Sequence, residues 1–371
     1  MTHASSDQML YFVLGTKAEF IKMSPVIIEA RKRGIPTRFI HTGQHPEGTG
    51  KLLEVFDVDD PDIWLRTGND LASIGAMIPW FVRHMLRAVF RRKAVRAELF
   101  PKPGICCVHG DTVSTFLGTV LARRAGLKVA HVEAGLRSWS ITQPFPEELI
   151  RILCMKTCHY LFAPNPLAVE NLERMKVKGE IHAMGANTVA DTLRLLGEHQ
   201  PTHPIPETDF VLVSCHRFEL IYSKPRLTWL LDNLERIAQS YPVYFALHEP
   251  TKLRVEKYGL WDRLNAIENL HLVPHMNYPD FIAWLRKAKF LVADGGSIQE
   301  ETHYLGVPCL IVRDKTEREE GLGTTAHLAH FDDKEVTKFL EKVAQADSIS
   351  AATHDARPAN YIIDHLFPGI T

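Results

Sequence analysis

The chain has 371 residues, of which 45% are hydrophobic and 23% are charged, and its formal net charge is -1. This composition is typical of a globular protein that stays in water, and the length suffices for two domains with separate cores. The balance of 43 Lys and Arg against 44 Asp and Glu gives no electrostatic basis for binding nucleic acid. No apolar run approaches the length of a membrane-spanning helix, so we expect no integral membrane segment.

Apolar runs alternate with helical patterns through the first half of the chain. The expected elements are a strand at 10–14, a helix at 19–33, a strand at 37–42, a loop at 43–48, a helix from about Thr49, and strands at 105–108 and 128–132. The alternation continues to Phe162 and predicts a doubly wound parallel sheet.

One segment of this half, residues 83–96, concentrates positive charge. Cationic residues interleave with apolar residues at helical spacing, among them Arg87, Arg91, Arg92, Lys93 and Arg96. A solvated helix with a buried apolar stripe explains the pattern. Peripheral contact with an anionic membrane surface or an acidic polymer explains it too.

The six cysteines lie mostly in apolar contexts without the spacing of a disulfide framework. The pair Cys154 and Cys158 has no matching second pair, so we expect no zinc site. With no signal peptide, reduced and buried thiols in a cytoplasmic protein are the best account.

A stretch rich in Pro, His and Thr at 198–208 interrupts the alternation and is interpreted as an interdomain linker. The elements expected after it are strands at 210–215, 243–247, 271–273, 290–293 and 309–312, and helices at 227–240, 278–288, from Gln299, and at 357–366. Two such halves without a metal motif favour a GT-B-like architecture, in which two Rossmann-like domains face each other across a cleft. We expect domains at 1–190 and 205–354, with 355–371 crossing back to the first.

Ionisable residues follow two neighbouring strands of the first predicted domain. Asp111 and Glu133 follow the strands at 105–108 and 128–132, and Glu147 comes shortly afterwards. Because ligands bind at the carboxyl ends of parallel strands, we expect these carboxylates to face one pocket suited to proton transfer. Each also has a structural explanation. Asp111 would cap a helix, Glu133 would pair with Arg137, and Glu147 would be favoured by a helix dipole.

Several other segments suit a phosphate or another anion. Gly15-Thr16 precedes Lys17 and Lys22 at a strand-to-helix turn, although a plain turn with surface lysines is equally compatible. In the second half, His216, Arg217 and His248 follow strands, where a structural histidine is the alternative. Residues 294–301 are the strongest such segment, because they place small residues at a helix start, as a diphosphate site requires; a Gly-rich turn with a capping Ser is the alternative.

Together these segments resemble the UDP-N-acetylglucosamine 2-epimerase family, most closely its non-hydrolysing bacterial branch. The resemblance runs nearly end to end. The matching positions are 15–25, 42–45, 110–112, 131–137, 144–148, 216–217, 248, 294–301 and 313–318. It implies a GT-B fold, no metal, no nicotinamide or other cofactor, and a homodimer.

The resemblance also implies a reaction and a set of site residues. A base removes the C2 proton of UDP-GlcNAc while UDP leaves C1, and re-addition of UDP with protonation on the other face gives UDP-ManNAc. The implied acid/base and diphosphate-side catalytic residues are Asp111, Glu133, Glu147 and His216. The implied binding residues are Lys17, Lys22, Arg137, Arg217, His248, Tyr278, Phe281, Gly295, Gly296, Ser297, Glu301, Arg313 and Arg318. Gln44 and His45 match a loop with allosteric substrate contacts.

Three motifs depart from the family pattern. Lys17-Ala18 replaces Arg-Pro, Asp294-Gly295-Gly296-Ser297 replaces Asp-Ser-Gly-Gly, and Glu319 replaces a proline. A lysine offers a point charge where arginine offers a bidentate fork. Three hypotheses follow. The first is a nucleotide-sugar 2-epimerase of surface polysaccharide synthesis, including a hydrolysing form that releases ManNAc and UDP. The second is a glycosyltransferase of the same fold, and the third is a non-catalytic nucleotide-sugar sensor or partner subunit.

Overall fold

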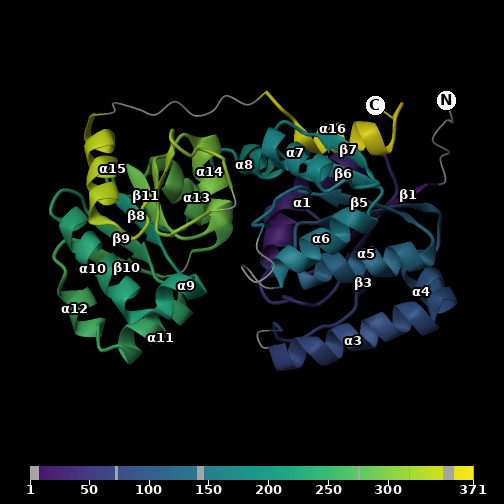
Figure 1. The fold of residues 1–371 in the computed structure, drawn as a ribbon, viewed down its shortest axis with the longest axis horizontal. Helices are drawn as coiled ribbons and strands as arrows, with labels where there is room; N and C mark the ends of the chain where they lie inside the picture. Colours follow the sequence, from purple (N-terminus) through teal and green to yellow (C-terminus); the bar gives the residue numbers. More distant parts are fainter. Residues whose placement is uncertain are drawn as a thin grey trace. The chain divides into compact units, whose positions relative to one another are not determined.

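The computed structural model describes residues 8–71, 74–139, 146–274, 276–316, 318–345 and 355–370. The chain divides into two compact units (Figure 1). Unit 1 comprises Met1–Leu195 and Asp355–Thr371, and unit 2 comprises Leu196–His354. The C-terminal helix therefore belongs to unit 1, where it packs against the first helix.

Unit 1 is built on a seven-stranded parallel sheet with the order β3-β2-β1-β4-β5-β6-β7. Its strands are β1 (Met9–Leu14), β2 (Thr37–His41), β3 (Ile63–Trp64), β4 (Gly104–His109), β5 (Lys128–Val132), β6 (Tyr160–Ala163) and β7 (Glu180–Ala183). Both faces are covered, so β1 and β4 are continuous apolar runs with buried side chains rather than alternating ones.

Helices connect these strands and form the outer layers of unit 1 (Figure 1). They are α1 (Lys17–Lys32), α2 (Thr49–Val55), α3 (Ile74–Phe90), α4 (Arg92–Leu99), α5 (Val113–Ala125), α6 (Glu147–Thr157), α7 (Pro166–Arg174), α8 (Val189–Leu196) and α16 (Pro358–Leu366). The basic segment 83–96 does not form one helix, because the backbone leaves the helical conformation at Arg91 (φ -122°, ψ 39°). The prediction of a single helix there is wrong.

Unit 2 repeats the design with a six-stranded parallel sheet of the order β10-β9-β8-β11-β12-β13. Its strands are β8 (Val211–Ser214), β9 (Val243–Ala246), β10 (Leu270–Val273), β11 (Phe290–Ala293), β12 (Cys309–Ile311) and β13 (Ala326–Leu328). Its helices are α9 (Phe218–Ile221), α10 (Lys224–Ala238), α11 (Glu249–Lys257), α12 (Trp261–Ala266), α13 (Tyr278–Lys287), α14 (Gly296–Leu305) and α15 (Asp333–Gln345). Two doubly wound parallel sheets confirm the predicted fold class.

The stretch 198–208, interpreted as a linker, lies within unit 2 and contacts it. The Nε2 atom of His199 is 2.8 Å from Oδ1 of Asp280, and the Thr202 N–H donates to the same oxygen at 3.3 Å. These contacts fix the stretch on α13.

All six cysteines are free and buried. Burial raises the pKa of Cys158 and Cys309 to about 12, so these thiols stay protonated and unreactive at neutral pH. Among the described residues, none of the helices is both long and apolar enough to cross a membrane.

The strand order reverses direction once in each sheet, between β1 and β4 in unit 1 and between β8 and β11 in unit 2. In open parallel sheets, ligands bind outside the carboxyl ends of the strands at such switch points. The loops after these four strands therefore define where a site is expected in each unit.

Candidate active site

In unit 1, the buried side chain of Glu19 joins the two loops at the switch point. Its Oε2 atom accepts hydrogen bonds from the N–H groups of Gly15 and Thr16, both at 2.8 Å, after β1. Its Oε1 atom accepts from the hydroxyls of Thr112 at 2.6 Å and Thr115 at 2.9 Å, after β4. Burial raises the pKa of Glu19, while these hydrogen bonds oppose the shift. One carboxyl group thus fixes both loops.

Asp111 directly precedes Thr112, one of the two threonines whose hydroxyls donate to Glu19. Gly110, before Asp111, has a φ of 67°, a left-handed conformation that glycine adopts without strain. Thr112 after it is the N-cap of α5, so the alternative that Asp111 caps this helix is wrong. The Asp111 carboxylate instead pairs with Arg151 of α6 at 2.5 Å, and its side chain stays 27% exposed.

A chain of alternating charges extends from Asp111 through α6. Arg151 also contacts Glu148 at 3.4 Å, and Glu148 accepts from Nε of Arg137 at 2.5 Å. The guanidinium of Arg137 lies 4.1 Å from the ring centroid of Trp139. Burial alone would raise the pKa of Glu148, but hydrogen bonds from Arg137 and the Ser138 N–H lower it overall. Arg137 is therefore held by Glu148.

Glu133 occupies a strained and buried position at the end of β5. Its φ of 65° is unusual for a residue with a side chain. Its carboxylate pairs with Lys22 of α1, accepts a hydrogen bond from the Asn187 amide, and lies 3.8 Å from Nε2 of His109. The alternative that Glu133 pairs with Arg137 is wrong, and Lys22 is a buried partner of Glu133 rather than a surface lysine.

His131 connects the surroundings of the two carboxylates. Its Nε2 donates to the carbonyl of Gly110 at 2.7 Å. Burial lowers the pKa of His131, and the charges of Asp111 and Glu133 oppose the shift. Because β4 and β5 are neighbouring strands, Asp111 and Glu133, which follow them, lie in the same region of unit 1.

Glu147 is the first residue of α6, the helix whose Arg151 contacts Asp111. Its Oε2 atom is buried and has no hydrogen-bond partner within the described part of the chain. A buried and unsatisfied carboxylate oxygen is costly in a purely structural role. Pro144 and Phe145, which precede it in the family-like motif, lie outside the described residues.

The loop after β2 packs on the same switch point. Gln44 is buried, and its Oε1 accepts from the N–H of Ser114 at 3.2 Å and from its hydroxyl at 2.7 Å. The His45 N–H donates to the Gly15 carbonyl at 2.8 Å. Lys17, in the first turn of α1, remains exposed. A ligand contact at Gln44 and His45 would thus act directly on the loops that carry Asp111 and Lys17.

In unit 2, Asp294 joins the two switch-point loops as Glu19 does in unit 1. Its Oδ2 accepts from the N–H groups of His216 at 2.9 Å and Arg217 at 2.7 Å. Burial raises the pKa of Asp294, and the charge of His216 opposes the shift. The His216 ring stacks on that of His248 with centroids 4.3 Å apart, and His248 lies 3.2 Å from the Ser214 hydroxyl.

The helix α14 begins at this point, three residues earlier than predicted. Its N-cap is Gly295, with no side-chain capping bond within this described segment, so the alternative of a capping Ser297 is wrong. The first N–H groups of a helix without a side-chain cap are suited to bind an anion. Gly296 is buried and Ser297 is partly exposed in this first turn.

Buried carboxylates line the next turn of α14. Glu301 accepts a hydrogen bond from the Tyr278 hydroxyl at 3.0 Å, and Glu300 pairs with Arg318. Gln299 donates to the carbonyls of Arg318 at 3.1 Å and of Glu320 at 2.8 Å, which ties the loop after β12 to α14. Arg318 is therefore a structural partner of Glu300.

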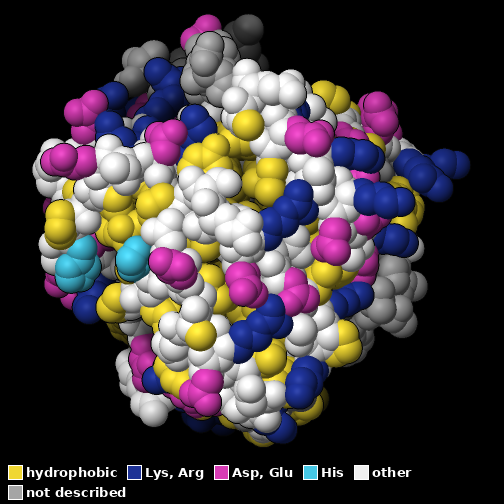
Figure 2. All heavy atoms as spheres, turned by 90° about the vertical axis from the view of Figure 1, so that its left-hand side faces the viewer, with side chains coloured by type: hydrophobic (Ala, Val, Ile, Leu, Met, Phe, Trp, Pro, Cys, Tyr) yellow, Lys and Arg dark blue, Asp and Glu magenta, His cyan; other side chains and the backbone are white. Residues whose placement is uncertain are grey.

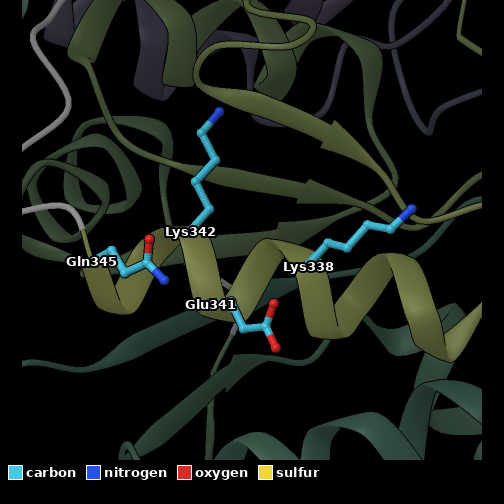
Figure 3. A pocket seen from close by; sticks show the side chains of 4 residues that line it. All are labelled: Lys338, Glu341, Lys342 and Gln345. Carbon is cyan, nitrogen blue, oxygen red and sulfur yellow. The ribbon is translucent and has the colours of Figure 1, made fainter.

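Two further predicted residues lie in unit 2. Phe281 on α13 and Arg313 after β12 are both half-buried. A shallow pocket elsewhere in unit 2 is lined by four side chains of α15 and contains none of the predicted site residues (Figure 3); they are Lys338, Glu341, Lys342 and Gln345. Among the described residues, no group of His, Cys, Asp and Glu has the arrangement of a metal site.

Comparisons with known proteins agree with this geometry. The family model described as UDP-N-acetylglucosamine 2-epimerase matches residues 28–364. The chain belongs to this family.

Individual members of the family match over most of their length. The UDP-N-acetylglucosamine 2-epimerase of Methanocaldococcus jannaschii is 30% identical over 341 residues, which are 88% of this chain and 89% of the relative. That of Salmonella borreze is 32% identical over 327 residues, covering 83% and 82%. A crystal structure of the Methanocaldococcus jannaschii enzyme in complex with UDP-GlcNAc and UDP superposes with a TM-score of 0.80 at 26% identity, covering 97% of this chain and 99% of that one.

Sequence reasoning missed several residues that organise the site in this epimerase-family chain. For two pairs of these residues, the spacing in the sequence indicates the contact. Thr16 and Glu19 form a capping box, and Glu148 and Arg151 lie at a spacing that puts both on one helix face. Asn187 had none, because its contact with Glu133 spans 54 residues of sequence.

Replacing Glu19 by Gln is expected to destabilise unit 1 by about 2 kcal/mol. One amide oxygen still accepts from the Gly15 and Thr16 N–H groups, but the amide N–H₂ then faces the Thr112 and Thr115 hydroxyls in place of a charged acceptor. Chemical denaturation followed by circular dichroism measures the change. Glu54→Gln on α2 is the control, because Glu54 is exposed and its loss is expected to cost less than about 0.5 kcal/mol. Equal effects of the two changes would contradict the bridging role of Glu19.

Proposed function

We propose that this protein is a UDP-N-acetylglucosamine 2-epimerase that interconverts UDP-GlcNAc and UDP-ManNAc. The observation that carries the proposal is the pair of carboxylates, Asp111 and Glu133, which follow the neighbouring strands β4 and β5 of unit 1. Membership in the family and the similarity to an enzyme crystallised with UDP-GlcNAc and UDP support the same substrate. They favour an epimerase over a glycosyltransferase or a non-catalytic sensor.

The proposed reaction has two halves. A carboxylate takes the proton from C2 of the sugar, the C1–O bond to UDP breaks with its electron pair leaving on the diphosphate, and a C1–C2 double bond forms. In the second half, a proton is delivered to the opposite face of C2 and UDP adds back at C1. Asp111, Glu133 and Glu147 are the candidates for the two proton transfers.

The diphosphate requires its own stabilisation as negative charge develops on it. In unit 2, His216, Arg217 and the N-terminal turn of α14 supply a partly exposed imidazole, a cation and free backbone N–H groups. Asp294 orients the first two through their backbone. Tyr278 and Glu301 are proposed to contact the uridine, because the buried hydroxyl and carboxylate are already positioned by one another.

Incubation with UDP-GlcNAc in D₂O without an acceptor tests the proposal. An epimerase incorporates deuterium at C2 and forms UDP-ManNAc, whereas a hydrolysing epimerase incorporates deuterium and releases ManNAc and UDP. NMR of the sugar distinguishes these products. Absence of exchange, with sugar transfer once an acceptor is supplied, would show a glycosyltransferase and sink the proposal.

We also propose that the protein acts in the cytoplasm as a homodimer and supplies an amino sugar for surface polysaccharide. Sedimentation velocity tests the assembly, since a dimer has about twice the 42.1 kDa mass of one chain. A mass of one chain at the concentrations of the exchange assay would contradict it.

A further inference from the structure

Trp139 has a strained backbone conformation at the end of the loop that follows β5. Its φ is 56°, in the left-handed region that bulky residues rarely adopt. Its side chain is 47% exposed, so burial in the core does not explain why the conformation persists. Strain of this kind persists only where surrounding contacts hold it, and such residues cluster at functional sites. The contacts that hold Trp139 therefore bear on its function.

Two guanidinium groups contact the Trp139 ring. The Cζ atoms of Arg137 and Arg174 each lie 4.1 Å from its centroid. The face of an indole ring attracts cations more strongly than the rings of tyrosine and phenylalanine do. Both contacts oppose the backbone strain, because each of them requires the ring to stay at this position.

Arg174 differs in this respect from cations such as Arg263. On the face of unit 2 shown in Figure 2, basic and acidic side chains are interspersed. Arg263 of α12 pairs with Asp232 and Glu235 of α10. Arg174, which is exposed in the last turn of α7, contacts an aromatic ring instead. Its contact therefore supports Trp139.

The rest of this loop is held on the same helix. The Asn171 side-chain amide donates to the Gly135 carbonyl at 3.0 Å. A Cβ atom on Gly135 would lie 2.2 Å from the carbonyl oxygen of Ala168, so the loop and α7 approach closely. Ala168, Asn171 and Arg174 recur at every third position and lie on one face of α7. The contact with Arg174 thus fixes Trp139 as the far end of a packed loop.

Arg137 connects Trp139 to the candidate acid/base residue Asp111. Nε of Arg137 donates to Glu148. Glu148 also contacts Arg151, and Arg151 pairs with Asp111. The side chains of Arg137, Glu148 and Arg151 are 8%, 0% and 7% exposed, so solvent screens these charges little. Glu148 is thus shared between two arginines, and the position of one affects the other.

We propose that Trp139 is a positioning residue for the proton transfer assigned to Asp111. The ring holds Arg137 on Glu148, which leaves Arg151 to pair with Asp111. Without the ring, Glu148 is expected to draw Arg151 towards itself, and the carboxylate of Asp111 loses the cation that fixes its orientation. This inference rests on the proposed epimerase function, because it assigns a further residue to the same site.

Trp139→Gly tests the inference, because glycine adopts a φ of 56° without strain. The variant is expected to melt at or above the wild-type temperature. Its kcat for deuterium exchange at C2 of UDP-GlcNAc is expected to fall about tenfold, with KM within about twofold of the wild-type value. Calorimetry with UDP gives the number of competent sites. A lower rate at unchanged stoichiometry therefore reflects slower turnover and not fewer folded molecules.

Lys176→Gly is the matched control. Lys176 is exposed just after α7 and has a φ of 50°, so this change also relieves left-handed strain. It is expected to leave exchange at the wild-type rate. An equal loss in both glycine variants would overturn the inference. So would a rise in KM at unchanged kcat in Trp139→Gly, which would place Trp139 in contact with the substrate.

Two further substitutions separate the cation contact from apolar packing. Trp139→Phe keeps an aromatic face and is expected to exchange within about threefold of the wild-type rate. Trp139→Leu keeps only apolar bulk and is expected to be as slow as Trp139→Gly. Equal rates in Trp139→Phe and Trp139→Leu would overturn the role of the ring in holding Arg137.

Arg174→Ala tests the outer contact. Arg124→Ala is its control, because Arg124 is also an exposed cation in the last turn of a helix of unit 1. Only Arg174→Ala is expected to lower kcat, by about threefold. It is also expected to shift the Trp139 fluorescence, taken as the difference from the same protein with Trp139→Phe, to longer wavelength. Equal effects of the two changes would overturn the stacked arrangement.

The exchange assay separates this inference from the function on which it rests. Wild-type exchange that Trp139→Gly leaves undiminished would overturn the inference alone. Absence of exchange in the wild type would overturn the proposed function and the inference with it.

Discussion

Asp111→Asn is expected to abolish deuterium exchange at C2 of UDP-GlcNAc, with a loss of about 10² to 10⁴-fold in rate. The amide has the shape of the carboxylate but cannot take up the proton. It also loses the ion pair with Arg151, whose partner atoms are 2.5 Å apart. UDP binding is expected to remain near the wild-type level, because the proposed diphosphate groups belong to unit 2. NMR in D₂O measures exchange, and calorimetry with UDP measures binding.

The matched control is Asp59→Asn, which removes the exposed ion pair of Asp59 with Arg31 in the same unit. This change is expected to leave both exchange and UDP binding at wild-type levels. Exchange at the wild-type rate in Asp111→Asn would show that Asp111 serves only to hold Arg151. Equal losses of exchange and UDP binding would point to a folding defect, which the melting curve of the variant would reveal.

Most strands could be predicted from the local sequence, because each is a short apolar run with polar ends. Strands β5 and β11 match the predicted residues one for one, since their boundaries coincide with a charged residue or a turn. The start of α14 was missed because Gly295-Gly296-Ser297 has the composition of a turn, yet Gly296 already has helical geometry. The break at Arg91 has no glycine or proline to mark it.

The positions of the candidate site residues could be predicted from the sequence, but their ion-pair partners could not. Residues that follow parallel strands lie at the same edge of the sheet. Asp111, Glu133 and His216 could therefore be predicted as candidates from the sequence alone. Their partners could not, because ion-pair choice depends on which helix packs above which strand. Arg137 is four residues from Glu133 in the sequence, but it pairs with Glu148. The partner of Glu133 is Lys22, which comes from α1.

In both units, a buried carboxylate joins the two loops at the switch point. A buried carboxylate, Glu19 in unit 1 and Asp294 in unit 2, accepts hydrogen bonds from backbone N–H groups and joins one loop to the other. Charged acceptors make stronger hydrogen bonds than neutral ones in a buried setting. The residues that would touch substrate are thus held by residues whose role is to fix the backbone.

Lys22→Met is expected to destabilise unit 1 by about 3 to 5 kcal/mol and to reduce exchange. The side chains of Lys22 and Glu133 are 4% and 6% exposed, so removing the cation leaves a buried carboxylate without its charge partner. The Asn187 amide and the His109 ring, 3.8 Å away, compensate only in part. Denaturation followed by circular dichroism measures the loss. Arg31→Met on the same helix is the control, because Asp59, the partner of Arg31, is 88% exposed and the pair is expected to contribute less than about 1 kcal/mol.

The double variant Lys22→Met, Glu133→Gln separates stability from catalysis. With neither charge present, no unpaired ion is buried, and most of the lost stability is expected to return. Exchange is expected to be absent, because the Glu133→Gln change leaves no carboxylate at this position to transfer a proton. Recovery of exchange together with stability would remove Glu133 from the proton-transfer candidates and leave it the role of holding α1 against β5. A loss below about 1 kcal/mol in Lys22→Met alone would show that the buried pair contributes little.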